Sequence, residues 1–116
     1  MAAGKYDIII EQGADLDLDI DYKDSAGSLL ALGSGYTAAM KIKESVGGTE
    51  IASLTNGSGI TLSSVSPNIN IKIAYGATAG YDFDNAVYDF ELKNTSADTK
   101  SRILEGRVEL SREVTA

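Results

Sequence analysis

The sequence predicts an all-β fold, an antiparallel β-sandwich of about seven to eight short strands. Apolar residues recur at every second position through most of the chain, which is the period of a strand with one buried face. Turn-forming residues separate these stretches about every 8–12 residues. A small closed β-barrel would bury the same alternating faces and is the alternative. No linker or internal repeat appears, so residues 1–116 are predicted to form one domain.

The first half of the chain carries four predicted strands, at residues 6–11, 14–22, 36–44 and 50–54. The second of these is the clearest, because Leu16, Leu18 and Ile20 share one face and aspartates occupy the other. The strand at 36–44 alternates in the same way. The first strand contains three consecutive isoleucines, and such a run suits a strand that is covered on both sides or passes between two sheets.

The second half carries four more predicted strands, at residues 60–62, 69–75, 88–93 and about 102–110. In the strand at 69–75, alternation places Tyr75 on the same face as three isoleucines. In the last strand, Leu104, Val108 and Leu110 are predicted to face inward, and Arg107 outward. Residues 76–80 are the only stretch predicted to hold a helical turn.

Composition excludes several classes of function. The chain has no His and no Cys, which removes the usual general base, thiol nucleophiles and the common transition-metal ligands. We therefore expect no enzyme activity and no cofactor. The formal charge is −7, and the ten basic residues form no run, so neither nucleic acid nor an anionic membrane is an expected partner. Residues 1–5 lack the apolar stretch of a signal peptide, and no segment approaches the roughly 20 apolar residues that span a bilayer.

A row of aspartates marks the outer face of the predicted strand at 14–22. Its members are Asp15, Asp17, Asp19 and Asp21. Same-face neighbours on a straight strand lie roughly 7 Å apart, too far for all four to share one calcium ion. The favoured interpretation is a solvated face that pairs with a lysine or arginine of a neighbouring strand, with Lys41, Lys43, Lys72 and Arg107 as candidates. Two other interpretations stay open: protection against edge-to-edge sheet pairing, and docking onto a basic partner.

A second acidic cluster lies near the predicted loop after Tyr81. Asp82 and Asp84 are the candidate metal ligands there, because a loop can curve to bring carboxylates together. The alternative is ordinary turn chemistry, in which Asp and Asn side chains bond to the local backbone. Paired carboxylates could also support glycoside hydrolysis, but a chain of this size has little surplus length to build a substrate cleft.

Several residues are candidates for contact with other subunits. Three consecutive isoleucines cannot all face one core, so either a partner covers part of the run or both faces are covered within the domain. An exposed Tyr81 would suit a protein interface, and the polar tail at 112–116 is a further candidate. The complete set is Ile8, Ile9, Ile10, Asp15, Asp17, Asp19, Tyr81 and Arg112.

Three stretches together resemble a family of small tailed-bacteriophage structural proteins of similar length. The stretches are Lys-Tyr-Asp-Ile-Ile-Ile-Glu-Gln-Gly at 5–13, Gly-Tyr-Thr-Ala-Ala-Met-Lys-Ile-Lys at 35–43, and Tyr-Asp-Phe-Glu-Leu at 88–92 followed by Leu-Glu-Gly-Arg-Val at 104–108. The second half is also similar to the immunoglobulin-like N-terminal modules of phage baseplate proteins. Residues 80–86 depart from the family pattern, which often has a Pro-Ala-Gly-Thr-Tyr-like turn there.

The resemblance implies an immunoglobulin-like β-sandwich and a non-enzymatic virion component, made in the host cytoplasm. It would belong to the tail, baseplate or fibre-attachment region and contact other virion proteins in multiple symmetric copies. A capsid or neck decoration (cement) protein is an alternative. A calcium-dependent carbohydrate-binding module using Asp82 and Asp84 is another.

Overall fold

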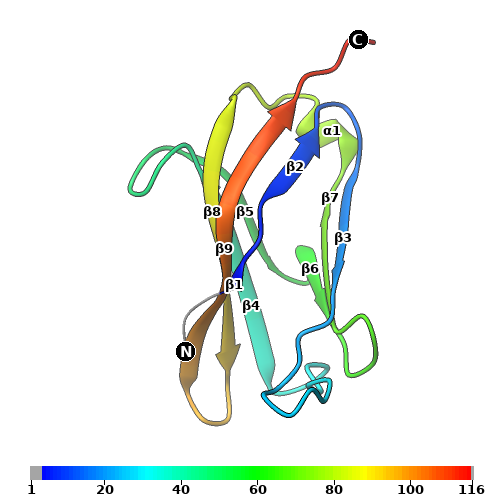
Figure 1. Ribbon diagram of the computed structural model, residues 1–116, viewed down its shortest axis with the longest axis vertical. Coiled ribbons are helices and arrows are strands. Elements are labelled where there is room, and N and C mark those ends of the chain that lie inside the picture. Colours follow the sequence, from blue (N-terminus) through cyan, green and yellow to red (C-terminus); the bar gives the residue numbers. More distant parts are fainter. Residues whose placement is uncertain (1–3, 116) are drawn as a thin grey trace.

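A computed structural model describes residues 4–115 as nine strands and one short helix (Figure 1). The strands are β1 (Gly4–Lys5), β2 (Ile8–Glu11), β3 (Leu16–Ile20), β4 (Tyr36–Lys43), β5 (Glu50–Asn56), β6 (Gly59–Leu62), β7 (Ile69–Ile73), β8 (Asn85–Asn94) and β9 (Thr99–Ser111). The helix α1 (Tyr75–Thr78) is a single turn, close to the predicted place. Within the described residues, no helix has the length and apolar character needed to cross a membrane.

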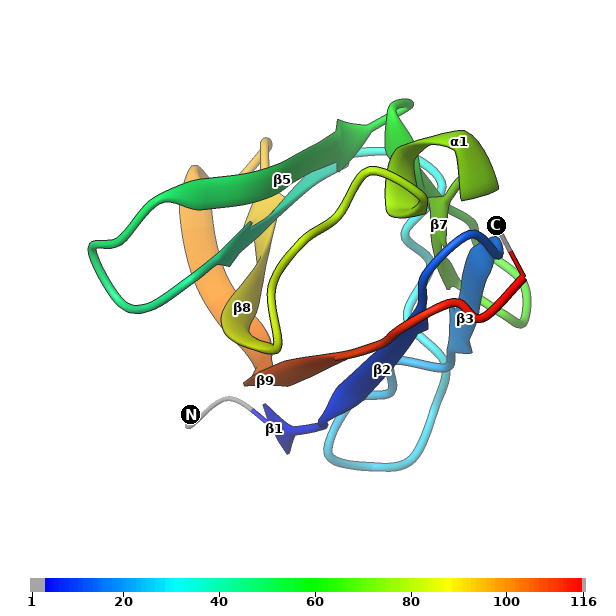
Figure 2. The same ribbon diagram turned by 90° about the horizontal axis from the view of Figure 1, so that it is seen from above.

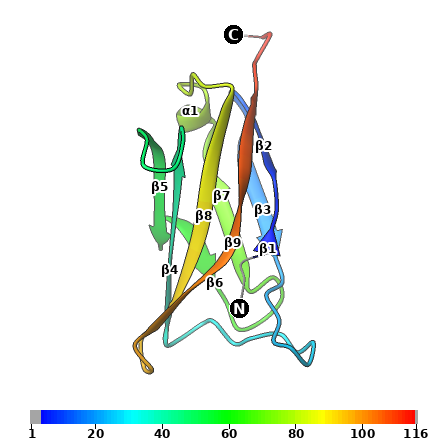
Figure 3. The same cartoon turned by 60° about the vertical axis from the view of Figure 1, so that its left-hand side comes forward.

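The strands form one curled sheet in the order β1-β9-β8-β4-β5-β6-β7-β3, with β2 also paired to β9 (Figures 2 and 3). The all-β prediction is therefore confirmed. The two ends of the curl, β2 and β3, approach each other, but no pairing joins them in the part of the chain that the structure describes. The arrangement lies between the predicted sandwich, which has two separate sheets, and the alternative closed barrel.

The prediction of an antiparallel sheet is wrong for three strand pairs. β1 and β2 both run parallel to β9, and β5 runs parallel to β6 at Thr55 and Asn56. Alternation within a strand carries no information on the direction of its neighbour. The β5–β6 pairing is local and lies across the tight turn at residues 57–58. Parallel pairing of separate strands needs a long connection, and between β2 and β9 that connection is most of the domain.

The N-terminal edge strand is broken where it passes Gly106. β1 ends at Lys5 and β2 begins at Ile8 in the same register against β9. At the break, the Tyr6 carbonyl approaches Gly106 so closely that a Cβ there would clash with it. The Tyr88 hydroxyl donates a hydrogen bond to the same carbonyl. Burial, together with the nearby Asp7 carboxylate and Tyr6, raises the pKa of Tyr88 to about 12.

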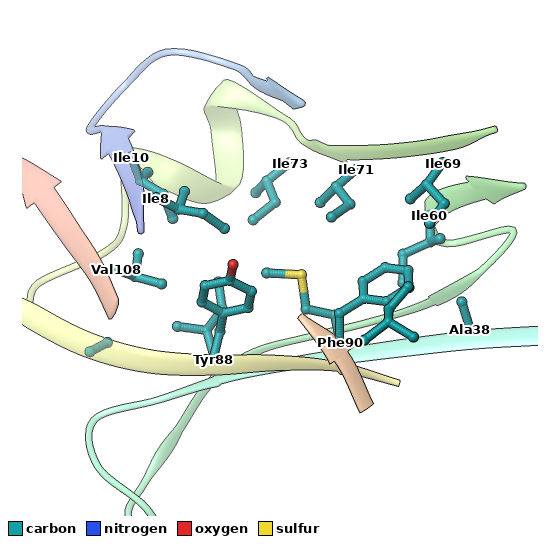
Figure 4. Close-up of a cluster of buried hydrophobic side chains, with 14 of the residues drawn as sticks. Ile8, Ile10, Ala38, Ile60, Ile69, Ile71, Ile73, Tyr88, Phe90 and Val108 are labelled. Atoms are coloured by element: carbon teal, nitrogen blue, oxygen red, sulfur yellow. The ribbon is translucent and has the colours of Figure 1, made fainter. Parts of the chain in front are cut away.

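The core lies inside the curl and is built by the inward positions of the alternating strands (Figure 4). Ile69, Ile71 and Ile73 of β7 face the inner residues of β2, β4, β8 and β9, and Phe90 is fully buried among them. Tyr75 departs from the prediction and is 65% exposed, because β7 ends at Ile73 and the chain turns into α1.

A β-bulge accounts for another departure from simple alternation. The register between β8 and β9 shifts after Phe90, which pairs with Leu104, while Glu91 pairs with Arg102. The residue in between, Ile103, is an extra residue of β9 and its side chain is buried. In a regular strand, neighbouring residues point to opposite faces. The bulge breaks this rule, so the Ile103 side chain is buried in the core and that of its neighbour Leu104 packs against the core as well.

The long connection between β3 and β4 is attached to the core by Asn68. This side chain is fully buried. Its amide donates to the carbonyls of Tyr22 and Leu30 at 2.8 and 2.9 Å, and its oxygen accepts from the Tyr22 N–H at 2.7 Å. Leu32, from the same connection, is 1% exposed. The buried Asn68 amide thus forms hydrogen bonds with backbone groups of the connection that are not paired within a strand.

Candidate functional site

Asp17 and Asp19 lie on the exposed face of β3, as alternation predicts, and Asp15 and Asp21 flank the strand, which is shorter than predicted. Asn70, on the neighbouring β7, donates its side-chain amide to Asp17 and Asp19, at 2.7 Å each. Asp15 accepts the Tyr75 N–H at 2.7 Å, and Asp21 accepts the Ser66 hydroxyl at 2.7 Å. The expected lysine or arginine partners are therefore replaced by neutral donors, which hold the carboxylates in place and leave their charges uncompensated. No group of three or more acidic residues in the described part of the chain is arranged to hold a metal.

The candidate metal ligands Asp82 and Asp84 surround an arginine. Arg112 contacts an oxygen of Asp82 at 3.0 Å and one of Asp84 at 3.1 Å, and it also reaches the Phe83 carbonyl at 3.4 Å. These hydrogen bonds raise the pKa of Arg112 above its usual value. The guanidinium thus occupies the position between the carboxylates that a bound cation would need, and it joins the tail to the loop before β8.

The three consecutive isoleucines divide between the core and the surface. Ile8 and Ile10 are 4% and 0% exposed, so their side chains belong to the protein's own core and are not available for the predicted subunit contact. Ile9 points the other way and is 60% exposed, beside Glu109 of β9. Of the three side chains, only that of Ile9 can reach a neighbouring molecule.

Tyr81 is half-buried rather than exposed. Its ring packs against Phe83 with centroids 6.0 Å apart, and burial raises the pKa of its hydroxyl. Its carbonyl accepts a hydrogen bond from the Gln12 side chain at 2.9 Å, and the Glu113 N–H donates to the same side chain at 2.9 Å. The Gln12 side chain therefore links Tyr81 and the chain end to the turn after β2.

A groove on the outer face of β1, β9, β8 and β4 gathers half of the basic residues. It measures about 500 Å³ and is bordered by the hairpin that joins β4 to β5. Its charged lining is Lys5, Lys41, Lys43, Arg102, Arg107, Asp89 and Glu105. Five cations against two carboxylates give a lining of +3, in a chain whose total formal charge is −7. We call this surface the cationic groove.

Sheet register explains how separate residues meet in the cationic groove. Lys43 of β4 pairs with Val87 of β8, which pairs with Arg107 of β9. All three project from the outer face, so the two cations lie two strand spacings apart, roughly 9.5 Å at the backbone. On the next rung, Lys41, Asp89 and Glu105 are aligned in the same way.

Only part of the groove is neutralised by ion pairs. Arg102 contacts Asp89 and Glu105, both at 3.3 Å, and Lys41 contacts Glu50 at 3.2 Å. Within residues 4–115, neither Lys43 nor Arg107 forms an ion pair. The Asp7 carboxylate lies near but accepts the backbone N–H of Arg107 at 3.0 Å. The groove therefore offers two free cationic heads on either side of Val87.

Sequence reasoning missed this groove because it treated the basic residues as scattered. Alternation places Arg107 on the outer face of its strand, and it places Lys41 and Lys43 together on one face of theirs. The missing information was the order of strands, since β4 and β8 are neighbours in space but distant along the chain. A search for basic residues at outward positions of different strands would have been the available signal.

Comparison with known proteins adds no relative. No protein-family model matches the chain, and no curated protein matches it in sequence. The resemblance to phage structural proteins therefore stays a prediction, and the candidate surfaces depend on geometry and charge alone.

Proposed function

We propose that this chain is a non-enzymatic assembly module that binds neighbouring subunits of a larger particle. Ile9 carries this proposal. It projects 60% exposed from β2, at an end of the sheet. β2 pairs with β9 on one side, and on the other side it approaches β3 without pairing with it in the described residues. Unpaired backbone groups beside an exposed branched apolar side chain form a surface suited to another chain.

The particle that we propose is a tailed bacteriophage, with the chain in the tail, baseplate or fibre-attachment region. The stretches at 5–13 and 35–43 support this placement by their resemblance to phage structural proteins. The first of these stretches contains β2, so the proposed contact surface falls within the segment that carries the sharpest part of the resemblance.

Replacing Ile9 by Thr tests the contact. Thr keeps the β-branched shape that suits a strand and removes most of the apolar surface. Burying a whole Ile side chain contributes about 1.5–3 kcal/mol, so losing most of it should reduce incorporation into particles about tenfold. Incorporation is measured by complementing a phage that lacks the gene and quantifying the chain in purified particles. Thermal unfolding of the isolated variant reports whether it still folds.

Val65→Thr is the matched control for this experiment. Val65 is also β-branched and 70% exposed, but it lies in the connection between β6 and β7. We expect the Val65 variant to enter particles at the wild-type level. Equal incorporation of the wild type and both variants would contradict the role of β2, and absence of the wild-type chain from particles would contradict the proposed function.

A further inference from the structure

We propose that the cationic groove of one copy binds the aspartate row of a second copy, so that the chain associates head to tail. This inference rests on the proposed assembly function and specifies one of its contacts. The occupant is identified by charge: a groove with a lining of +3 favours an acidic partner, and each copy of the chain carries an exposed acidic row.

The groove supplies cations that are free to act between molecules. Lys41 and Arg102 are already engaged with carboxylates of their own chain. Lys43 and Arg107 form no ion pair within the described residues, and their long side chains extend from neighbouring parts of one concave face. An incoming carboxylate therefore meets a positive potential without first breaking an ion pair within the groove.

The aspartate row supplies carboxylates in fixed positions. Asn70 bridges Asp17 and Asp19, so both side chains are oriented before any partner arrives. Asn70 is neutral, and these two carboxylates therefore keep their charge. Lys72 stands opposite Asp17 in the register of β3 and β7 and is the nearest cation in that pairing, but it forms no ion pair with the row within residues 4–115.

The two surfaces lie on opposite sides of the molecule, so one chain cannot satisfy both by itself. Seen from above, the hairpin that borders the groove projects on the left, and β3 and β7 lie on the right (Figure 2). A contact between two different surfaces of identical chains leaves one of each surface free, and it repeats until a ring closes or a filament grows. This geometry accounts for how multiple copies could be arranged around or along a particle.

The rim of the cationic groove also carries an exposed apolar residue. Val46, in the hairpin between β4 and β5, lines the groove and is 94% exposed. A partner that enters the groove can cover this side chain together with Val87 at the groove floor. Burial of these side chains gives the contact a component that salt does not screen.

Two charge-reversed variants test the contact by mixing. The first carries Lys43→Glu and Arg107→Glu, and the second carries Asp17→Lys and Asp19→Lys. Sedimentation velocity of the purified wild type at rising protein concentration should show self-association that weakens with salt, since exposed charges are screened beyond a Debye length of roughly 8–10 Å. Each variant alone should associate at least about tenfold more weakly, because like charges then face each other.

The mixture of the two variants should associate again. The acidic groove of the first then meets the basic row of the second, and the unchanged basic groove of the second meets the unchanged acidic row of the first. Misfolding cannot produce this recovery, and circular dichroism of each variant checks the fold directly. Lys93→Glu with Lys100→Glu changes the net charge as much as the first variant but outside the groove, and it should associate like the wild type.

Three results would overturn the head-to-tail contact: a wild type that remains monomeric, variants that associate as well as the wild type, or a mixture that does not recover. These results concern only this contact. The proposed function is decided separately by particle incorporation of the Ile9 variant, which has both cationic groove and aspartate row intact.

Discussion

Asn68 shows how much of this fold depends on one polar side chain. Its three hydrogen bonds hold Tyr22 and Leu30 of the long connection between β3 and β4. A buried polar group with satisfied partners costs little, whereas removing it leaves those partners unpaired. In the sequence, Asn68 stands out only because it follows the single proline. A buried Asn and an Asn in an exposed turn can have the same neighbours in sequence, so its burial could not be predicted.

Replacing Asn68 by Ala should lower the free energy of unfolding by about 2–3 kcal/mol, since the Tyr22 N–H and the Leu30 carbonyl lose a partner. The Tyr22 carbonyl keeps its hydrogen bond from the Leu30 N–H. Urea denaturation of the purified chain measures this loss. Asn56→Ala, at an exposed position at the end of β5, is the control and should change stability by less than about 0.5 kcal/mol. Equal effects of the two substitutions would contradict the anchoring role of Asn68.

Tyr88 should make stability depend on pH in alkaline solution. In the unfolded chain its hydroxyl ionises near pH 10, whereas the folded protein keeps the proton until a pH of about 12. The contribution to stability is therefore fully present below about pH 10, and it is lost as pH rises from about 10 to about 12. Denaturation of the wild type and Tyr88→Phe across this range should show a shallower decline for the variant.

The control for this titration is Tyr75→Phe. Tyr75 is 65% exposed, so this substitution removes a tyrosine hydroxyl that lies outside the core. If Tyr88→Phe declines as steeply as the wild type, the burial of the Tyr88 hydroxyl against Tyr6 is contradicted.

At the scale of elements, alternation located the strands but not their partners. The expected strands at 36–44 and 88–93 correspond to β4 and β8, and Met40, Tyr88 and Phe90 on their apolar faces are buried. Alternation records which face of a strand is apolar. It carries no information on strand direction, and so the parallel pairing of β1 and β2 with β9 could not be predicted from it.

The same limit explains the outcome for the candidate contact residues. Alternation along the three isoleucines implies that the middle side chain points away from the other two, and Ile9 is indeed exposed. It could not place Arg112 between Asp82 and Asp84, because that contact depends on where the end of β9 lies relative to a loop distant in sequence. The cationic groove was missed for a related reason: strand order, not sequence distance, joins its parts.

Docking of the N-terminal edge strand should be sensitive to Gly106. The Tyr6 carbonyl fills the space of a Cβ at this position, so Gly106→Ala must displace the backbone between β1 and β2. We expect a loss of about 1–3 kcal/mol in the free energy of unfolding, as for other overpacked sites. Thermal denaturation measures it. Gly76→Ala is the control, because nothing lies within 4 Å of a Cβ there, and a similar loss in both variants would contradict the close approach.

At the scale of the whole molecule, the charge is divided between two sides. The total of −7 conceals a groove lining of +3, while the exposed aspartates lie along β3. An acidic total argues against nucleic acid as a partner. It does not describe the surface that a protein partner meets. Together with the exposed Ile9, this division is what we expect of a module that contacts several neighbours at once.

The most direct test of the proposed assembly role is an electron cryomicroscopy reconstruction of the proposed phage particle, purified with its wild-type chain. Our account predicts density for the chain in multiple symmetric copies, with the outer edge of β2 covered and Ile9 buried against a neighbouring subunit. A particle without this chain, or one in which Ile9 and the free edge of β2 remain exposed to solvent in every copy, would contradict it.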